Sequence, residues 1–90
     1  MSKAKFTKPD DIFREILRKL RRSKNLTQAE VAARLGQPQS FVSKYETGER
    51  RLDFVETFLV CEALGIDVVQ FAAKFAAQVG EARRRKAGNG

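Results

Sequence analysis

Apolar residues recur along most of this chain at the spacing of amphipathic α-helices. From about Pro9, one continuous apolar stripe repeats every three or four residues, and it consists of Ile12, Phe13, Ile16, Leu17 and Leu20. Four further stretches with helical spacing follow, ending near Gly80, and none alternates as a half-buried strand would. The pattern therefore predicts an all-α fold of five helices within residues 9–80.

Helix start signals repeat at the predicted helix boundaries. A short polar residue able to cap a helix is followed three residues later by Glu or Gln, which is the capping-box spacing. It occurs three times, at Thr27 and Glu30, at Asp53 and Glu56, and at Asp67 and Gln70. Stop signals match them, since Gly36, Gly48 and Gly65 stand where helices should end. Local signals and the global pattern thus agree on the helical fold.

The stretch from residue 27 to residue 46 meets the requirements of a helix–turn–helix motif. Ala32 is small enough for two helices to cross, Gly36 suits the turn, and Val42 can face the first helix. Pro38 is expected at the first position of the second helix, where its missing N–H costs nothing. The outward residues of that second helix are then Gln39, Ser40, Ser43 and Lys44. Gln can pair with adenine and Lys with guanine at the edges exposed in the major groove.

Charge is unevenly distributed in this 90-residue, single-domain chain of net charge +7. Residues 1–24 carry nine Lys and Arg against three Asp and Glu, whereas residues 52–80 carry one against four. A net positive charge favours a polyanionic partner. We expect residues 1–8 to form a flexible basic arm and residues 81–90 a flexible basic tail. Either could add phosphate contacts or simply keep the protein in solution.

Enzyme chemistry finds little support in the residues. The chain has no histidine, and its only cysteine, Cys61, lies among apolar neighbours, where it is expected to be a small buried side chain. No glycine-rich phosphate loop, metal-ligand spacing or cofactor motif is present. One cysteine cannot form an internal disulfide, and no signal peptide or membrane span is evident. We therefore expect a cytoplasmic protein that is not an enzyme and binds no cofactor or metal.

The segment from Leu20 to Asp67 resembles the Xre/Cro-type helix–turn–helix proteins, which include the phage lambda-type repressors. The resemblance rests on Leu-Thr-Gln at residues 26–28, on Ala32 and Gly36, on the run Ser43, Glu46, Gly48, and on Leu-Gly at residues 64–65. It implies a five-helix lambda-repressor-like domain that binds double-stranded DNA and regulates transcription, most often as a repressor.

The resemblance also implies roles for individual residues. Gln39, Ser40 and Lys44 would face base edges, and Phe41 would either touch a thymine methyl, which we favour, or pack sideways. Gln28, Arg50 and Arg51 would hold DNA phosphates, and Ser43 would contact phosphate or base. Arg21 would pair with Glu46 and brace the first helix against the recognition helix.

Partners other than DNA are suggested by the last predicted helix. Its apolar face is wide for a small domain, and Val68, Phe71 and Phe75 are candidates for a two-fold dimer contact on a palindromic operator. All of these residues could instead belong to the core. Two other functions stay open: an antitoxin that neutralises a protein toxin and regulates its own operon, and an interaction module that has lost DNA binding.

Overall fold

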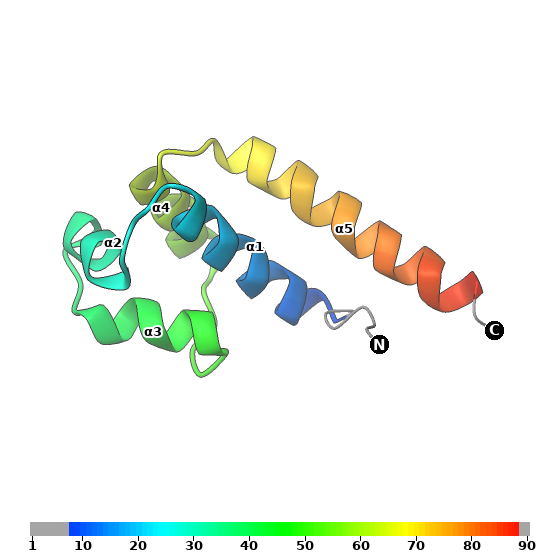
Figure 1. Ribbon diagram of the computed structural model, residues 1–90, viewed down its shortest axis with the longest axis horizontal. Helices are drawn as coiled ribbons and strands as arrows, with labels where there is room; N and C mark the ends of the chain where they lie inside the picture. Colours follow the sequence, from blue (N-terminus) through cyan, green and yellow to red (C-terminus); the bar gives the residue numbers. More distant parts are fainter. Residues whose placement is uncertain (1–7, 89–90) are drawn as a thin grey trace.

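The computed structural model describes residues 8–88 of the chain, and this range contains five α-helices and no strand (Figure 1). The all-α, five-helix prediction is confirmed. In Figure 1, α1 lies between α3 on one side and the long α5 on the other. The helices are α1 (Pro9–Ser23), α2 (Gln28–Leu35), α3 (Gln39–Thr47), α4 (Phe54–Leu64) and α5 (Val68–Gly88).

Two capping boxes fix the starts of α2 and α4. At α2, Thr27 Oγ1 accepts from the Glu30 N–H at 3.1 Å, and Glu30 Oε1 accepts from the Thr27 N–H at 2.8 Å. Asp53 and Glu56 form the same pair of bonds at α4, at 2.7 and 2.9 Å. Each box satisfies two N–H groups that a helix start would otherwise leave without partners.

The turn between α2 and α3 is set by Gly36. Its φ of +68° is left-handed, and the next N–H, of Gln37, donates to the Ala32 carbonyl at 2.9 Å. This arrangement closes α2 and turns the chain within three residues into α3. Glycine adopts the conformation without the Cβ clash that other residues would suffer.

Three local predictions were wrong. Pro38 is the N-cap residue before α3 and not its first helical residue. Its backbone is extended, although its carbonyl already accepts a hydrogen bond from the Phe41 N–H. Asp67 caps α5 through Val69 N–H at 2.8 Å, two residues on, and not through Gln70. The last helix does not end near Gly80 but continues to Gly88. Burial of Ala82 provides a packing reason for the first of the two additional turns.

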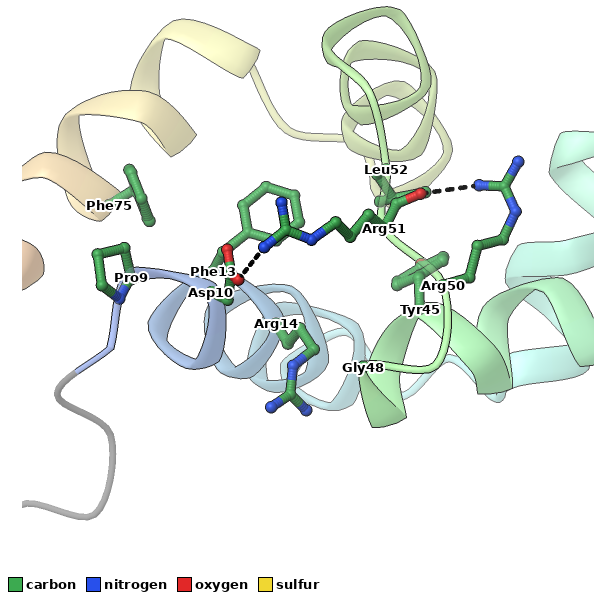
Figure 2. A pocket seen from close by; sticks show the side chains of 10 residues that line it. All are labelled: Pro9, Asp10, Phe13, Arg14, Tyr45, Gly48, Arg50, Arg51, Leu52 and Phe75. Carbon is green, nitrogen blue, oxygen red and sulfur yellow. Dashed lines mark hydrogen bonds and ion pairs between the residues drawn. The ribbon is translucent and has the colours of Figure 1, made fainter.

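The loop between α3 and α4 folds back onto the start of α1 (Figure 2). Arg51 in this loop forms an ion pair with Asp10 in the first turn of α1. Arg14 on α1 donates to the Glu46 carbonyl near the end of α3 at 3.1 Å. The end of the helix–turn–helix is therefore attached to α1 from two sides.

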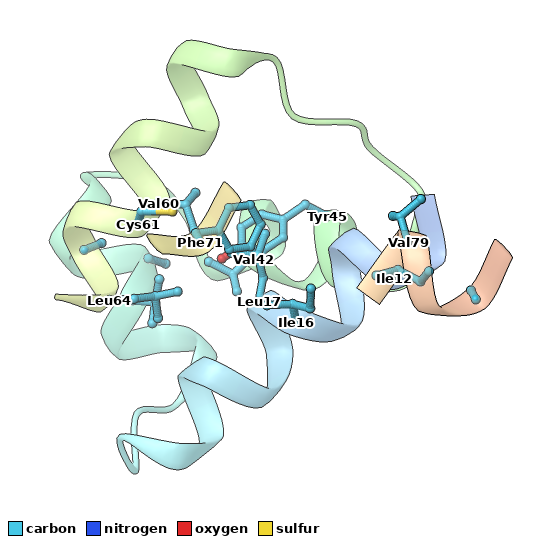
Figure 3. Close-up of a cluster of buried hydrophobic side chains, with 14 residues drawn as sticks. Ile12, Ile16, Leu17, Val42, Tyr45, Val60, Cys61, Leu64, Phe71 and Val79 are labelled. Atoms are coloured by element: carbon cyan, nitrogen blue, oxygen red, sulfur yellow. The ribbon is translucent and has the colours of Figure 1, made fainter. Parts of the chain in front are cut away.

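One hydrophobic core joins all five helices (Figure 3). Val31 and Ala32 of α2 meet Val42 and Tyr45 of α3, and all four are almost fully buried. The positions predicted for the crossing of the motif helices are thus confirmed as core. The rest of the core is formed by Ile12, Ile16, Leu17, Val60, Cys61, Ala63, Leu64, Phe71, Val79 and Ala82.

An aromatic cluster attaches α5 to α1. The Phe13 ring meets Phe71 and Phe75 edge-on, with centroids 5.6 and 6.1 Å apart. Such contacts add to the energy of burial alone. No helix among residues 8–88 is long and apolar enough to cross a membrane.

Candidate nucleic-acid interface

The exposed face of α3 carries the side chains predicted to read DNA. Gln39, Ser40 and Lys44 are exposed, and Ser43 is half-buried beside them. These positions share one side of the helix, because residues four apart on a helix are neighbours. The opposite side, with Val42, is buried against α2. Gln39, Ser40 and Lys44, three of the four residues predicted to read bases, therefore lie together with Ser43 on one outward surface.

A buried ion pair braces α3 against α1. Arg21 Nε and Nη2 donate to the two carboxylate oxygens of Glu46 at 2.7 and 3.0 Å, and Arg21 Nη1 donates to the Leu26 carbonyl at 2.9 Å. Both residues are less than a tenth exposed. The hydrogen bonds that Arg21 donates to Glu46 raise the pKa of Arg21 above its usual value. This is the pair that the resemblance implied, and its bidentate geometry holds the two helices at one angle.

The ion pair extends by hydrogen bonds to the tip of the recognition helix. Gln28 Nε2 donates to Glu46 Oε1 at 3.0 Å, and Gln39 Nε2 donates to Gln28 Oε1 at 3.3 Å. The Glu46 carboxylate only accepts, so it determines which end of the Gln28 amide faces it. The amide oxygen of Gln28 is then directed toward Gln39. Four side chains from α1, α2 and α3 thus form one chain, which we call the Gln39 relay: Arg21, Glu46, Gln28 and Gln39.

An open depression lies beside the Gln39 relay at the N-terminus of α2. Its lining includes Arg22, Asn25, Gln28 and Gln39. Helix N-termini attract anions through their free N–H groups and dipole, and the exposed Arg22 adds a positive charge. Sequence reasoning gave Arg22 no role in DNA binding. Its position near the end of α1, six residues before the start of α2, was the available signal.

The loop arginines, expected to hold DNA phosphates, already have protein partners. Arg50 donates to both carboxylate oxygens of Glu56 at 3.1 and 2.8 Å, which raises the pKa of Arg50 and lowers that of Glu56. Arg51 is paired with Asp10. Sequence reasoning missed both carboxylates, because it assigned Glu56 only to a capping box and gave Asp10 no role.

Phe41 packs sideways, which is the role we did not favour. Its half-buried ring meets Tyr45 edge-on at 5.7 Å, and the Arg50 guanidinium lies 4.8 Å from its centroid. A cation over a ring face adds a favourable interaction. Phe41 therefore joins Arg50 and Tyr45 in a stack at the end of the interface.

The predicted dimer residues are mostly committed to the core. Phe71 is 5% exposed and Phe75 is half-buried, because both pack against Phe13 of α1, and Val68 is half-buried against the core. The prediction of Phe71 as a dimer contact was therefore wrong. Apolar exposure occurs on α4 and at the start of α5 instead, and these residues form what we call the α4 patch: Phe54, Val55, Phe58, Leu59 and Val69.

A signal for the α4 patch was present in the sequence. Residues 54–64 are apolar on more sides than one buried helix face requires. Sequence reasoning did not identify Phe54, Val55, Phe58 and Leu59 as a surface patch. Only the opposite side of α4, with Val60, Cys61 and Leu64, is buried.

Cys61 is a buried core residue, as predicted. Burial raises the pKa of its thiol to about 11, so the thiol stays protonated at neutral pH. Among the residues that the structure describes, no three His, Cys, Asp or Glu side chains are grouped to hold a metal ion.

Comparison with known proteins identifies the fold family. The Helix-turn-helix family model HTH_3 matches residues 17–71, which is more than half of the chain. An XRE-family like protein from Pseudomonas syringae pv. tomato is 41% identical and superposes with a TM-score of 0.75, over 78% of this chain and 85% of that one. The chain belongs to the Xre/Cro-type helix–turn–helix family. It is therefore a DNA-binding transcriptional regulator.

Two further relatives show the range of this Xre/Cro-type family. An uncharacterized HTH-type transcriptional regulator, y4dJ, of Sinorhizobium fredii is 40% identical over 52 residues, which is 58% of this chain and 68% of that protein. The restriction-modification controller protein C.AhdI from Aeromonas hydrophila is 31% identical, with a TM-score of 0.64 over 69% of this chain and 94% of that one.

Proposed function

We propose that this Xre/Cro-type protein is a cytoplasmic repressor that binds a roughly palindromic operator as a homodimer, with α3 in the major groove. The observation that carries the proposal is the Gln39 relay. It fixes the amide of Gln39 at the exposed N-terminal end of α3, where the side chains of a recognition helix reach base edges. A side chain oriented before binding loses less conformational freedom on the DNA.

Base reading in this proposal falls to three exposed residues of α3. Gln39 would form two hydrogen bonds with adenine, through N6 and N7, and Lys44 would donate to N7 and O6 of guanine. Ser40 stands beside Gln39 in the first turn and would donate or accept at a neighbouring base. Phe41 contributes indirectly, because its ring is held in the stack with Arg50 and Tyr45.

Phosphate contacts in this proposal surround α3. Gln28, Arg22 and the N-terminus of α2 would hold one phosphate. Ser43, on the outward side of α3, would hold another. Arg51 would exchange Asp10 for a phosphate, since that pair is solvent-exposed and such pairs contribute at most about 1 kcal/mol. Arg50 would remain with Glu56, because its two hydrogen bonds and its contact with Phe41 hold it in place.

Dimerisation in this proposal uses the α4 patch. Phe54 is 75% exposed and Val69 71%, and apolar side chains gathered at a protein surface commonly mark an interface. Residues 52–80, which contain the patch, carry a net negative charge, so this side would face away from DNA. A homodimer on a palindromic operator would need its two α3 helices in successive major grooves, about 34 Å apart.

The proposal is tested by selecting bound sequences from a pool of random duplexes. The expected result is an inverted repeat whose half-sites are centred about 10 base pairs apart. Replacing Gln39 with alanine should relax the preference at one position in each half-site, whereas Gln78→Ala, on the exposed surface of α5, should select the same repeat. Enrichment of no sequence at all would contradict a specific operator.

A further inference from the structure

A cavity of about 200 Å³ lies where the start of α1, the α3–α4 loop and α5 meet (Figure 2). It is separate from the exposed face of α3 and from the Gln39 relay, none of whose residues lines it. Its lining combines apolar and charged side chains. Apolar side chains are contributed by Pro9, Phe13, Tyr45, Leu52 and Phe75, and charged ones by Asp10, Arg14, Arg50 and Arg51.

Each of the three arginines that line the cavity is paired with a carboxylate: Arg14 with Asp11, Arg50 with Glu56 and Arg51 with Asp10. An anionic ligand can therefore bind an arginine here only by replacing the carboxylate of one of these pairs. Two of the three are held by several partners: Arg14 by Asp11 and the Glu46 carbonyl, and Arg50 by both oxygens of Glu56. Arg51 differs from them, because its side chain is 83% exposed and pairs with Asp10, which is 68% exposed. This pair is the most easily exchanged.

The size of the cavity limits the ligand. Drug-sized ligands occupy pockets of roughly 300–1,000 Å³, whereas an apolar cavity of roughly 150 Å³ admits one benzene ring. The volume here therefore suits one ring with a short acidic group. The aromatic wall of Phe13 and Phe75 favours a flat apolar ring over a sugar or an inorganic ion.

We infer that this cavity is a binding site for a small aromatic monocarboxylate, whose ring packs on Phe13, Leu52 and Phe75 and whose carboxylate replaces Asp10 at Arg51. The binding itself needs no DNA. One consequence rests on the proposed function: a ligand that occupies Arg51 competes with the DNA phosphate that Arg51 would hold. The ligand would then weaken operator binding.

The direct test is an NMR titration of the full chain with benzoate and 3-phenylpropionate, without DNA. We expect saturable shifts of the Leu52 methyl and the Phe13 and Phe75 ring signals, with a dissociation constant on the order of 1 mM. Acetate tests the need for the ring, benzamide the need for the charge, and inorganic phosphate a general anion site. Equal binding of any of the three, or no saturable shift at these residues, would overturn the inference.

Two exposed variants test the role assigned to Arg51. Asp10→Asn removes the competing carboxylate and should tighten benzoate binding about two- to fivefold, whereas Arg51→Gln should weaken it by at least that factor. Arg83→Gln, an exposed arginine outside the cavity, is the matched control and should change nothing. An unchanged affinity in both test variants would contradict the inference.

A final titration separates this inference from the proposed function. Adding benzoate to a protein–operator mixture should lower operator affinity in the native chain and leave it unchanged in Arg51→Gln. If benzoate binds but operator affinity does not change, the competition at Arg51 is wrong. If the chain binds no operator, the proposed function fails while the NMR result still decides on the ligand site.

Discussion

Gln39 Nε2 donates to Gln28 Oε1 at 3.3 Å, so the first side chain of the recognition helix is attached to the first residue of the helix before it. Gln28 is held in turn by Glu46, which Arg21 holds from α1. The side chain proposed to read a base is therefore oriented by residues that need not touch one.

Coupling between Gln28 and Gln39 is the first prediction. Each alanine variant should weaken operator binding, and the double variant should lose less than the sum of the two losses. The reason is that Gln28→Ala already removes the group that orients Gln39. We expect a coupling energy of about 0.5–3 kcal/mol from a double-mutant cycle measured by fluorescence anisotropy. Simple additivity would mean that the two amides act independently.

Replacing Glu46 with alanine should lower the free energy of unfolding more than replacing any exposed carboxylate. Glu46→Ala leaves the buried Arg21 guanidinium without its partner, and breaking a buried pair on one side costs about 3–5 kcal/mol. Urea denaturation followed by circular dichroism measures this cost. Glu49→Ala, in the exposed turn after α3, is the control and should stay within about 0.5 kcal/mol of the native chain. Similar midpoints for the two variants would refute the brace.

Stability should fall in alkaline solution as Cys61 ionises on unfolding. Its folded pKa, about 11, lies above the ordinary value of 9.0, so the folded chain keeps its proton where the unfolded chain has lost it. The contribution of the Cys61 thiol to the free energy of unfolding is fully present below pH 9. It falls by roughly 2 kcal/mol as the pH rises toward 11. Tyr45, whose pKa burial also raises, adds a decline of the same sign above pH 10.

The Cys61 contribution is isolated by Cys61→Ala. Urea unfolding at pH 8, 9, 10 and 11 should show a smaller decline in this variant than in the native chain, with the part due to Tyr45 remaining. Parallel declines in the two proteins would show that Cys61 does not carry the effect.

The α4 patch should decide the oligomeric state. Phe54→Ala and Phe58→Ala together remove two exposed rings, and loss of buried aromatic contacts at an interface typically costs more than 1 kcal/mol each. Sedimentation equilibrium should show a dimer dissociation constant at least tenfold higher. Gln70→Ala with Gln78→Ala, exposed positions on α5, should leave it unchanged. A native chain that is monomeric both free and on operator DNA would contradict the homodimer.

Local features of the fold were predictable because their causes lie close together in the sequence. Thr27 with Glu30 and Asp53 with Glu56 satisfy helix starts within four residues, and Gly36 ends α2 through its own backbone. Such features need no knowledge of how helices pack. Asp67 shows that such predictions can fail, because its carboxylate has the spacing of a capping box with Gln70 but accepts from the Val69 N–H instead.

Features that depend on the packing of distant helices were not predictable. Arg51 meets Asp10 across 41 residues, and Phe71 is covered because Phe13 from α1 lies against it. Neither partner follows from helical spacing, which indicates the apolar side of each helix but not the helix that covers it. The Arg21–Glu46 pair joins residues 25 apart, and only the resemblance to a known family suggested it.

The central claim, that α3 reads DNA through Gln39 while other residues hold phosphates, is tested most directly by one titration series. Operator and random duplexes are titrated with the native chain and with Gln39→Ala at several salt concentrations. We predict that log K falls linearly with log salt for every combination, and that Gln39→Ala loses about 1–3 kcal/mol on the operator only. A flat salt dependence, or an equal loss on random DNA, would contradict the account.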